Sequence, residues 1–190
     1  YVKRIEGIIK SFSQSSIKFD VKLCQLVNLS NDGKPVKMSK RAGNFITMKS
    51  VVNSVGADVL RFIMLTRKND APLDFDMLKV KEQSKDNPVY YVQYANIRIN
   101  SLYKKAINLG IDLNNNMDNI DFSLLSKPSE LSLIKIISKW PRQVEAAAIA
   151  NEPHRITFYL NDLASAFHYS WSLGNTKSEL RYIVEDNLNL

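Results

Sequence analysis

The fold is decided by the stretch Asn87-Pro88-Val89-Tyr90-Tyr91-Val92-Gln93-Tyr94-Ala95. Asparagine is a preferred helix N-cap and proline is favoured in the first helical turn, so this stretch predicts that a helix begins here. Apolar residues continue at helical spacing as far as Ala106, and Gly110 fits the position just beyond a helix end. A helix of this length spans roughly 30 Å, which is enough to organise a helical bundle.

The sequence downstream of this helix predicts further helices. An Asn- and Asp-rich segment at 111–128 is typical of a loop, and apolar periodicity resumes near Ser129. The other expected features are a helix end at Pro141, an Ala-rich helix at 144–150, a helix that begins at Pro153, a turn at 174–176 and a last helix at 178–190. We expect residues 86–190 to form an all-helical domain, truncated at its C-terminus because the last helix ends while still apolar.

Residues 1–85 mix helical and strand patterns. Helical spacing at 2–12 predicts an amphipathic helix, and alternation of apolar and polar residues at 21–30 predicts a strand. The residues Asn31-Asp32-Gly33 then predict a sharp turn. The rest of this domain is expected to contain a helix over 50–67 that Gly56 interrupts, a polar connection at 69–76 and one or two helical turns at 79–85. The expected fold class is mostly α, with an α/β part in residues 1–85.

Composition and charge narrow the class of protein. No run of about 18 apolar residues occurs, so we expect no membrane span, and the single cysteine, Cys24, excludes an intrachain disulfide and suits the cytoplasm. The net charge of +7 is unevenly distributed: residues 1–85 hold 16 Lys and Arg against 8 Asp and Glu, and residues 86–190 hold 10 against 11. Nucleic-acid binding by the helical domain must therefore depend on local basic patches and on stacking with bases, and not on its net charge.

A basic loop, Lys37-Met38-Ser39-Lys40-Arg41, follows the expected strand and turn. Lysine ammonium groups act as point charges, and phosphate oxygens are their natural ligands. Cleavage of a nucleoside triphosphate between its α and β phosphates builds negative charge on the departing pyrophosphate, and cations placed there lower the barrier. The alternative is an ordinary solvated basic turn, which the number of charges alone favours.

The amino-acid sequences of the loop and of several other segments resemble those of one protein family. Lys37-Met38-Ser39-Lys40 resembles the second signature of the class I aminoacyl-tRNA synthetases. The segments that resemble the arginyl-tRNA synthetases in particular are 25–27, Gly33, 37–43, 56–62, 74–76, 86–95, 153–155 and 163–168. The run at 86–95 discriminates best, because sister synthetases share the basic loop but not that helix. The resemblance implies the C-terminal part of a Rossmann-type catalytic domain in residues 1–85 and an anticodon-binding bundle in residues 86–190.

The resemblance also implies roles for individual residues. Lys37 and Lys40 would bind the ATP phosphates and stabilise the transition state of arginine activation. Met38 would pack near the adenine, Ser39 would lie beside the phosphates, and Arg41 would be an auxiliary cation. The implied substrates are ATP, with Mg²⁺ in the full-length enzyme, arginine and tRNA(Arg), and we expect a monomer.

The resemblance places the anticodon arm near the helix that begins at Asn87. The residues expected to contact tRNA are Asn87, Gln93, Tyr94 and Arg98. A tyrosine that stacks on a base is worth about 1–3 kcal/mol. The alternative is that Tyr90, Tyr91 and Tyr94 pack the bundle, with their hydroxyls at its rim. His154 and His168 fit packing or capping better than ligation, and two scattered histidines with one cysteine predict no metal site.

One family signature has no counterpart in this sequence. Class I synthetases carry an earlier His-Ile-Gly-His-like motif, and the amino-acid pocket should also lie upstream of Tyr1. We therefore expect a full-length protein that is an arginine–tRNA ligase, and a 190-residue piece that forms no adenylate alone. The alternatives are another class I synthetase such as the cysteinyl or methionyl type, a non-catalytic helical RNA-binding module, and a helical scaffold with an incidental basic turn.

Overall fold

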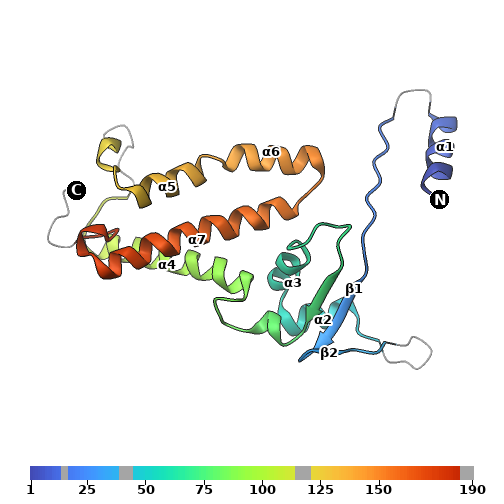
Figure 1. Ribbon diagram of the computed structural model, residues 1–190, viewed down its shortest axis with the longest axis horizontal. Helices are drawn as coiled ribbons and strands as arrows, with labels where there is room; N and C mark the ends of the chain where they lie inside the picture. The colour runs from blue at the N-terminus through green and yellow to red at the C-terminus, as the bar shows by residue number, and fades with distance from the viewer. Residues whose placement is uncertain (14–16, 39–44, 114–120, 185–190) are drawn as a thin grey trace.

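The computed structural model describes residues 1–13, 17–38, 45–113 and 121–184 of the chain. Its helices and strands are α1 (Val2–Phe12), β1 (Val27–Asn31), β2 (Lys34–Pro35), α2 (Met48–Val55), α3 (Ala57–Met64), β3 (Leu73–Asp76), α4 (Pro88–Asn108), α5 (Pro128–Ile137), α6 (Trp140–Ala150) and α7 (His154–Thr176). Figure 1 shows a small sheet with α2 and α3 beside it, followed by the longer helices α4 to α7. The described part of the chain is mostly helical, as the sequence predicts.

The sheet contains three strands in the order β2-β1-β3. β1 and β2 form an antiparallel hairpin, and Asp32 and Gly33 at its turn have φ values of 53° and 72°. The expected turn is therefore confirmed, because both residue types tolerate positive φ. β3 pairs with β1 in parallel, with α2 and α3 in the connection, as in a βαβ unit.

Three expectations for this half of the chain are wrong. The strand begins at Val27 rather than at residue 21, because residues 21–26 find no strand to pair with among the described residues. The connection at 69–76 contains β3, which short alternation at Leu73–Asp76 did not reveal. Gly56, at φ 88°, separates two helices rather than interrupting one, since few other residues adopt that conformation.

The core of the first half is built around Phe75, which is completely buried. Side chains from the flanking helices and from η1 (Lys79–Lys81) surround it. The buried members of this cluster are Val51, Leu60, Ile63, Leu73, Phe75, Val80 and Val89. Because Val89 lies in the first turn of α4, the long helix is anchored in the core of the sheet domain.

The second half is helical throughout its described residues, and α7 is its centre. α4, α5 and α6 all pack on α7 (Figure 1). Ala95, Ala164 and Phe167 are the buried members of the core between α4 and α7. The predicted start of α4 is confirmed: Asn87 accepts a hydrogen bond from Val89 N through its side chain. The expected break near Pro141 lies at 138–139, and Pro141 is in the first turn of α6, where its missing N–H costs nothing.

The last segment differs from the expected turn and helix. α7 continues through 174–176, and only η4 (Ser178–Leu180) follows as a 3-10 turn among the described residues. The chain then returns over the end of α7, where Tyr182 packs on Phe167 at 5.6 Å between ring centroids. Burial raises the pKa of Tyr182. Gly174 permits this return, because a Cβ there would lie 3.1 Å from Leu180 O and 3.2 Å from Arg181 Cα.

Replacing Gly174 by alanine is therefore expected to destabilise the chain. The added methyl group meets backbone atoms, and overpacking of this kind costs about 1–3 kcal/mol. The matched control is Gly7→Ala in α1, where a Cβ meets nothing within 4 Å and alanine favours the helix. Urea unfolding measures both variants, and equal midpoints for Gly174→Ala and the wild-type chain would contradict the close approach.

Hydrogen bonds connect the first half of the chain to the helices of the second half. Thr157 of α7 is buried, and its hydroxyl lies 2.7 Å from Leu65 O at the end of α3. The extended segment before β1 also reaches the helical half, since Lys22 Nζ donates to Ala150 O at 2.9 Å. α1 lies apart from the sheet and the bundle in Figure 1, and none of its residues is buried.

Candidate functional site

The β1–β2 hairpin delivers the first residues of the basic loop. Val36 N donates to Leu29 O at 2.9 Å, so the hairpin register extends to the residue before Lys37. Lys37 is exposed and Met38 is half exposed, so both are accessible to a ligand. Ser39, Lys40 and Arg41 lie outside the described residues. The role of the loop as an ATP-phosphate site is therefore a proposal that starts from Lys37.

A carboxylate that the sequence reasoning missed holds this hairpin in place. Asp76 ends β3 and is buried, and its two oxygens accept hydrogen bonds from β1, from the hairpin turn and from the start of η1. The donors are Ser30 Oγ at 3.1 Å, Asp32 N at 3.2 Å, Gly33 N at 2.7 Å, Leu78 N at 3.0 Å and Lys79 N at 3.2 Å. These hydrogen bonds, above all that from Gly33, hold the pKa of the Asp76 carboxyl far below its usual value, against the opposing effect of burial.

The residues expected to contact tRNA do not share one environment. Asn87 is buried, and its side-chain amide donates to Val80 O at 3.0 Å and to Glu82 O at 2.7 Å. Both amide protons are thus used inside the chain, while Oδ1 caps α4. Gln93, by contrast, is exposed. Asn87 therefore has a structural task as an N-cap, and only Gln93, Tyr94 and Arg98 remain available for a surface on α4.

Tyr94 and Arg98 belong to a polar and aromatic cluster between α4 and α7. The Arg98 guanidinium lies 4.3 Å from the Tyr94 ring centroid and 5.0 Å from that of Trp171. It also contacts His168 Nδ1 at 3.0 Å, while His168 Nε2 lies 3.0 Å from Tyr91 O. Because arginine can only donate, Nδ1 accepts and Nε2 carries the proton. We name Tyr91, Tyr94, Arg98, His168 and Trp171 the α4–α7 cluster.

His168 and Trp171 are members of this cluster that sequence reasoning did not place with Arg98. Both belong to α7, at least 70 positions from Arg98 along the chain. His168 was expected to pack or cap rather than to bind a metal, and both of its ring nitrogens are engaged within the chain. The cluster leaves Tyr94 and Arg98 half exposed, so their outer faces can meet a ligand.

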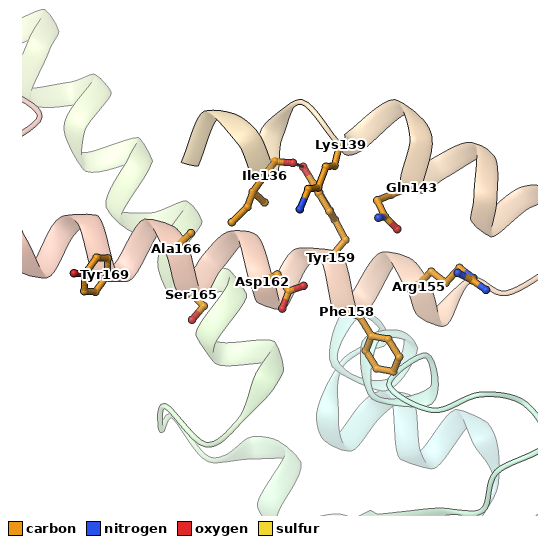
Figure 2. Close-up of a pocket in the computed structure, with 10 residues that line it drawn as sticks. All are labelled: Ile136, Lys139, Gln143, Arg155, Phe158, Tyr159, Asp162, Ser165, Ala166 and Tyr169. Atoms are coloured by element: carbon orange, nitrogen blue, oxygen red, sulfur yellow. Dashed lines mark hydrogen bonds between the residues drawn. The ribbon is translucent and has the colours of Figure 1, made fainter. Parts of the chain in front are cut away.

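A separate groove of about 690 Å³ lies between α7 and the pair α5 and α6. Figure 2 shows Arg155 and Phe158 at one end of it and Tyr169 at the other. Since each helical residue advances by about 100°, the groove occupies the face of α7 opposite the α4–α7 cluster. Arg155 is already paired with Glu152, at 2.7 Å, and Asp162 adds a negative charge. The groove thus offers stacking and hydrogen bonding but little net charge for phosphates.

The described part of the chain contains neither a candidate metal centre nor a candidate membrane-spanning helix. No group of three or more His, Cys, Asp or Glu residues that could hold a metal ion occurs there. None of the described helices is both long and apolar enough to cross a bilayer.

Family models define the class of the chain. The model of the tRNA synthetases class I (I, L, M and V) matches residues 17–76, which include the hairpin and the basic loop. The model of the DALR anticodon binding domain matches residues 92–187, half of the chain. The chain belongs to the DALR anticodon binding domain family, joined here to a class I synthetase segment. The two matches leave 77–91 between them, and the domain boundary at 85/86 stays a prediction.

Individual relatives are more specific. The chain is 54% identical over 186 residues to a protein of Ruegeria pomeroyi named Arginine--tRNA ligase, and 51% identical over 192 residues to one of Rickettsia rickettsii with the same name. These alignments cover 97% and 100% of the chain but only 32% and 33% of the relatives. The chain therefore spans about a third of the length of the curated relatives it matches.

Two solved structures have a similar fold over most of this chain. A Campylobacter jejuni structure assigned as an arginyl-tRNA synthetase is 34% identical, with a TM-score of 0.68 over 80% of this chain and 32% of its own. The arginyl-tRNA synthetase of Thermus thermophilus, at 21% identity, shares the fold with a TM-score of 0.52 over 74% of this chain and 25% of its own.

Proposed function

We propose that this chain is the part of an arginine–tRNA ligase that carries the ATP-phosphate loop and the anticodon-binding bundle. The observation that carries this proposal is similarity along the whole chain to relatives named Arginine--tRNA ligase, at 54% identity for the first of them. The full-length enzyme would work in the cytoplasm, activate arginine with ATP and transfer it to tRNA(Arg).

The proposed chemistry needs cations at the departing pyrophosphate. Lys37 leaves the hairpin with an exposed side chain, and Lys40 and Arg41 follow in the sequence. Ammonium groups that meet the phosphates only as charge develops lower the barrier without tightening ATP binding. Mg²⁺ would enter as a companion of the ATP phosphates, which commonly supply much of its coordination. Ser39 would add a hydroxyl donor, and Met38 would pack near the adenine.

The experiment that tests the function is a charging assay with the full-length protein. Purified enzyme is incubated with ATP, total tRNA and each of the twenty amino acids in turn. Arginine should be attached to tRNA at least a hundred times faster than cysteine or methionine. Charging of another amino acid would favour a sister class I synthetase. No charging at all, with tRNA binding retained, would favour a non-catalytic RNA-binding module.

The exposed faces of Gln93, Tyr94 and Arg98 form the proposed tRNA contact on α4. Replacing Tyr94 by alanine removes a ring that can stack on a base, a loss of about 1–3 kcal/mol, so the Kd for tRNA(Arg) should rise about 5- to 150-fold. Tyr94→Phe keeps the ring and should retain most of the affinity. The matched control is Tyr103→Ala, an exposed tyrosine farther along the same helix. Filter binding measures all three, and equal effects at both positions would contradict a specific contact at Tyr94.

A further inference from the structure

The buried carboxylate of Asp76 lies where the basic loop leaves the sheet. Asp32 N and Gly33 N donate to opposite oxygens of this carboxylate, at 3.2 Å and 2.7 Å. Hydrogen bonds from backbone N–H groups to an ionised carboxylate are stronger than those to a neutral acceptor. The hairpin turn is therefore held to the end of β3 by more than the pairing of its strands.

The path from this anchor to the loop is short. Gly33 is four residues before Lys37, and β2 and Val36 lie between them. Val36 N donates to Leu29 O, so the segment is fixed at the turn and again just before Lys37. A shift of the turn would thus be passed to the position at which Lys37 leaves the hairpin.

The same carboxylate also accepts hydrogen bonds from the segment that follows β3. Oδ1 accepts from Leu78 N and Lys79 N, at 3.0 Å and 3.2 Å, as the chain turns toward η1 and α4. Asp76 thus joins the hairpin to the segment that leads into the helical bundle. A neutral side chain of the same shape could not accept from all of these donors.

We propose that Asp76 is a positioning residue for arginine activation, which holds the β1–β2 hairpin so that Lys37 meets the ATP phosphates in the transition state. This inference rests on the proposed function, because it needs Lys37 to act on ATP. Asp76 itself touches no substrate; it acts through the turn at Asp32 and Gly33.

Asp76→Asn tests the inference in the full-length enzyme. In either orientation of the amide, its nitrogen faces a backbone N–H of the turn, that of Gly33 or that of Asp32, so one anchoring hydrogen bond is lost. Misplacement of a reacting group by about 1 Å can cost about 100-fold. We expect kcat for ATP–pyrophosphate exchange with arginine and tRNA to fall about 10- to 100-fold. The KM for ATP should change less than about 2-fold, because the lost interaction belongs to the transition state.

The matched control is Asp74→Asn, which makes the same change of charge two residues away. Asp74 lies on the same strand, is exposed, and accepts from Asn28 Nδ2 at 2.8 Å. Its kcat should stay within about 2-fold of the wild-type value. An equal loss in both variants would show a general effect of charge and overturn the inference.

A double-mutant cycle separates positioning from simple destabilisation. If Asp76 acts through Lys37, then Lys37→Ala should lower kcat by less than about 10-fold in the Asp76→Asn background, against about 100-fold or more alone. A full Lys37 effect in both backgrounds would overturn the inference but leave the proposed function intact. A Lys37→Ala variant with wild-type kcat would overturn both. If Asp76→Asn fails to fold, Ser30→Ala removes only one donor, and an unchanged kcat in that variant would overturn the inference.

Discussion

Replacement of Lys37 or Lys40 by alanine in the full-length enzyme is expected to lower the rate of arginine activation about 100- to 1,000-fold. Removal of one preorganised donor from a developing negative charge has this magnitude in other enzymes. The KM for ATP should change little, because the cations act mainly on the departing pyrophosphate. ATP–pyrophosphate exchange with arginine and tRNA present measures the effect.

Lys34→Ala provides the control for this prediction. Lys34 is an exposed lysine in β2 of the same hairpin, so its loss removes the same charge three residues earlier. The Lys34 variant should keep activation within about 3-fold of the wild-type enzyme. The Kd for tRNA(Arg) should be unchanged in all three variants, because the proposed tRNA contact lies on α4. If Lys37→Ala and Lys40→Ala both activated arginine at the wild-type rate, the catalytic role of the loop would be contradicted. The alternative, a solvated basic turn, would then be favoured.

Replacement of Phe75 by alanine is expected to have the largest effect on stability. Phe75 is completely buried among Leu60, Leu73, Val89 and the other members of the first core. Truncation of a buried phenylalanine costs about 3–5 kcal/mol, since it removes apolar contacts and leaves a cavity. That loss is a large fraction of the 5–15 kcal/mol typical of a folded domain. Urea unfolding followed by circular dichroism measures it.

Phe122→Ala is the matched control, because Phe122 is 60% exposed. Exposed substitutions away from special features usually change stability by less than about 0.5 kcal/mol. A similar unfolding midpoint for the two variants would show that Phe75 does not hold the core. Because Val89 shares this cluster, the Phe75 variant should also loosen the first turn of α4, which hydrogen exchange of its amides can detect.

Local signals predicted much of the fold. The start of α4 at Asn87 and Pro88, its end before Gly110 and the turn at Asp32 and Gly33 are all specified within a few residues. Capping, proline geometry and positive φ act over this short range, so the sequence is enough to place them. The class I synthetase segment and the anticodon-binding segment were also recognisable from the sequence, because each is a continuous range of residues.

Other features depend on residues far apart in the chain. β3 is a strand because Leu73–Asp76 pairs with Val27–Ser30, more than 40 positions earlier. Gly174 lies within α7 and leaves room for the segment at 180–181 to pass close to it, whereas glycine alone predicted a turn. Neither pairing nor close approach leaves a periodic pattern that sequence reasoning can read.

The candidate site shows the same division. The sequence by itself determined the basic loop at 37–41, the long helix with Tyr94 and Arg98, and the family to which both point, because each is written in consecutive residues or at helical spacing. The tertiary structure alone decided that Asp76 anchors the hairpin before Lys37 and that His168 orients Arg98. It also showed that both amide protons of Asn87, the predicted N-cap, are used within the chain. The physical reason is that a hydrogen bond needs its two partners within about 3 Å, and only the folded chain brings residues 40 to 70 positions apart to that distance.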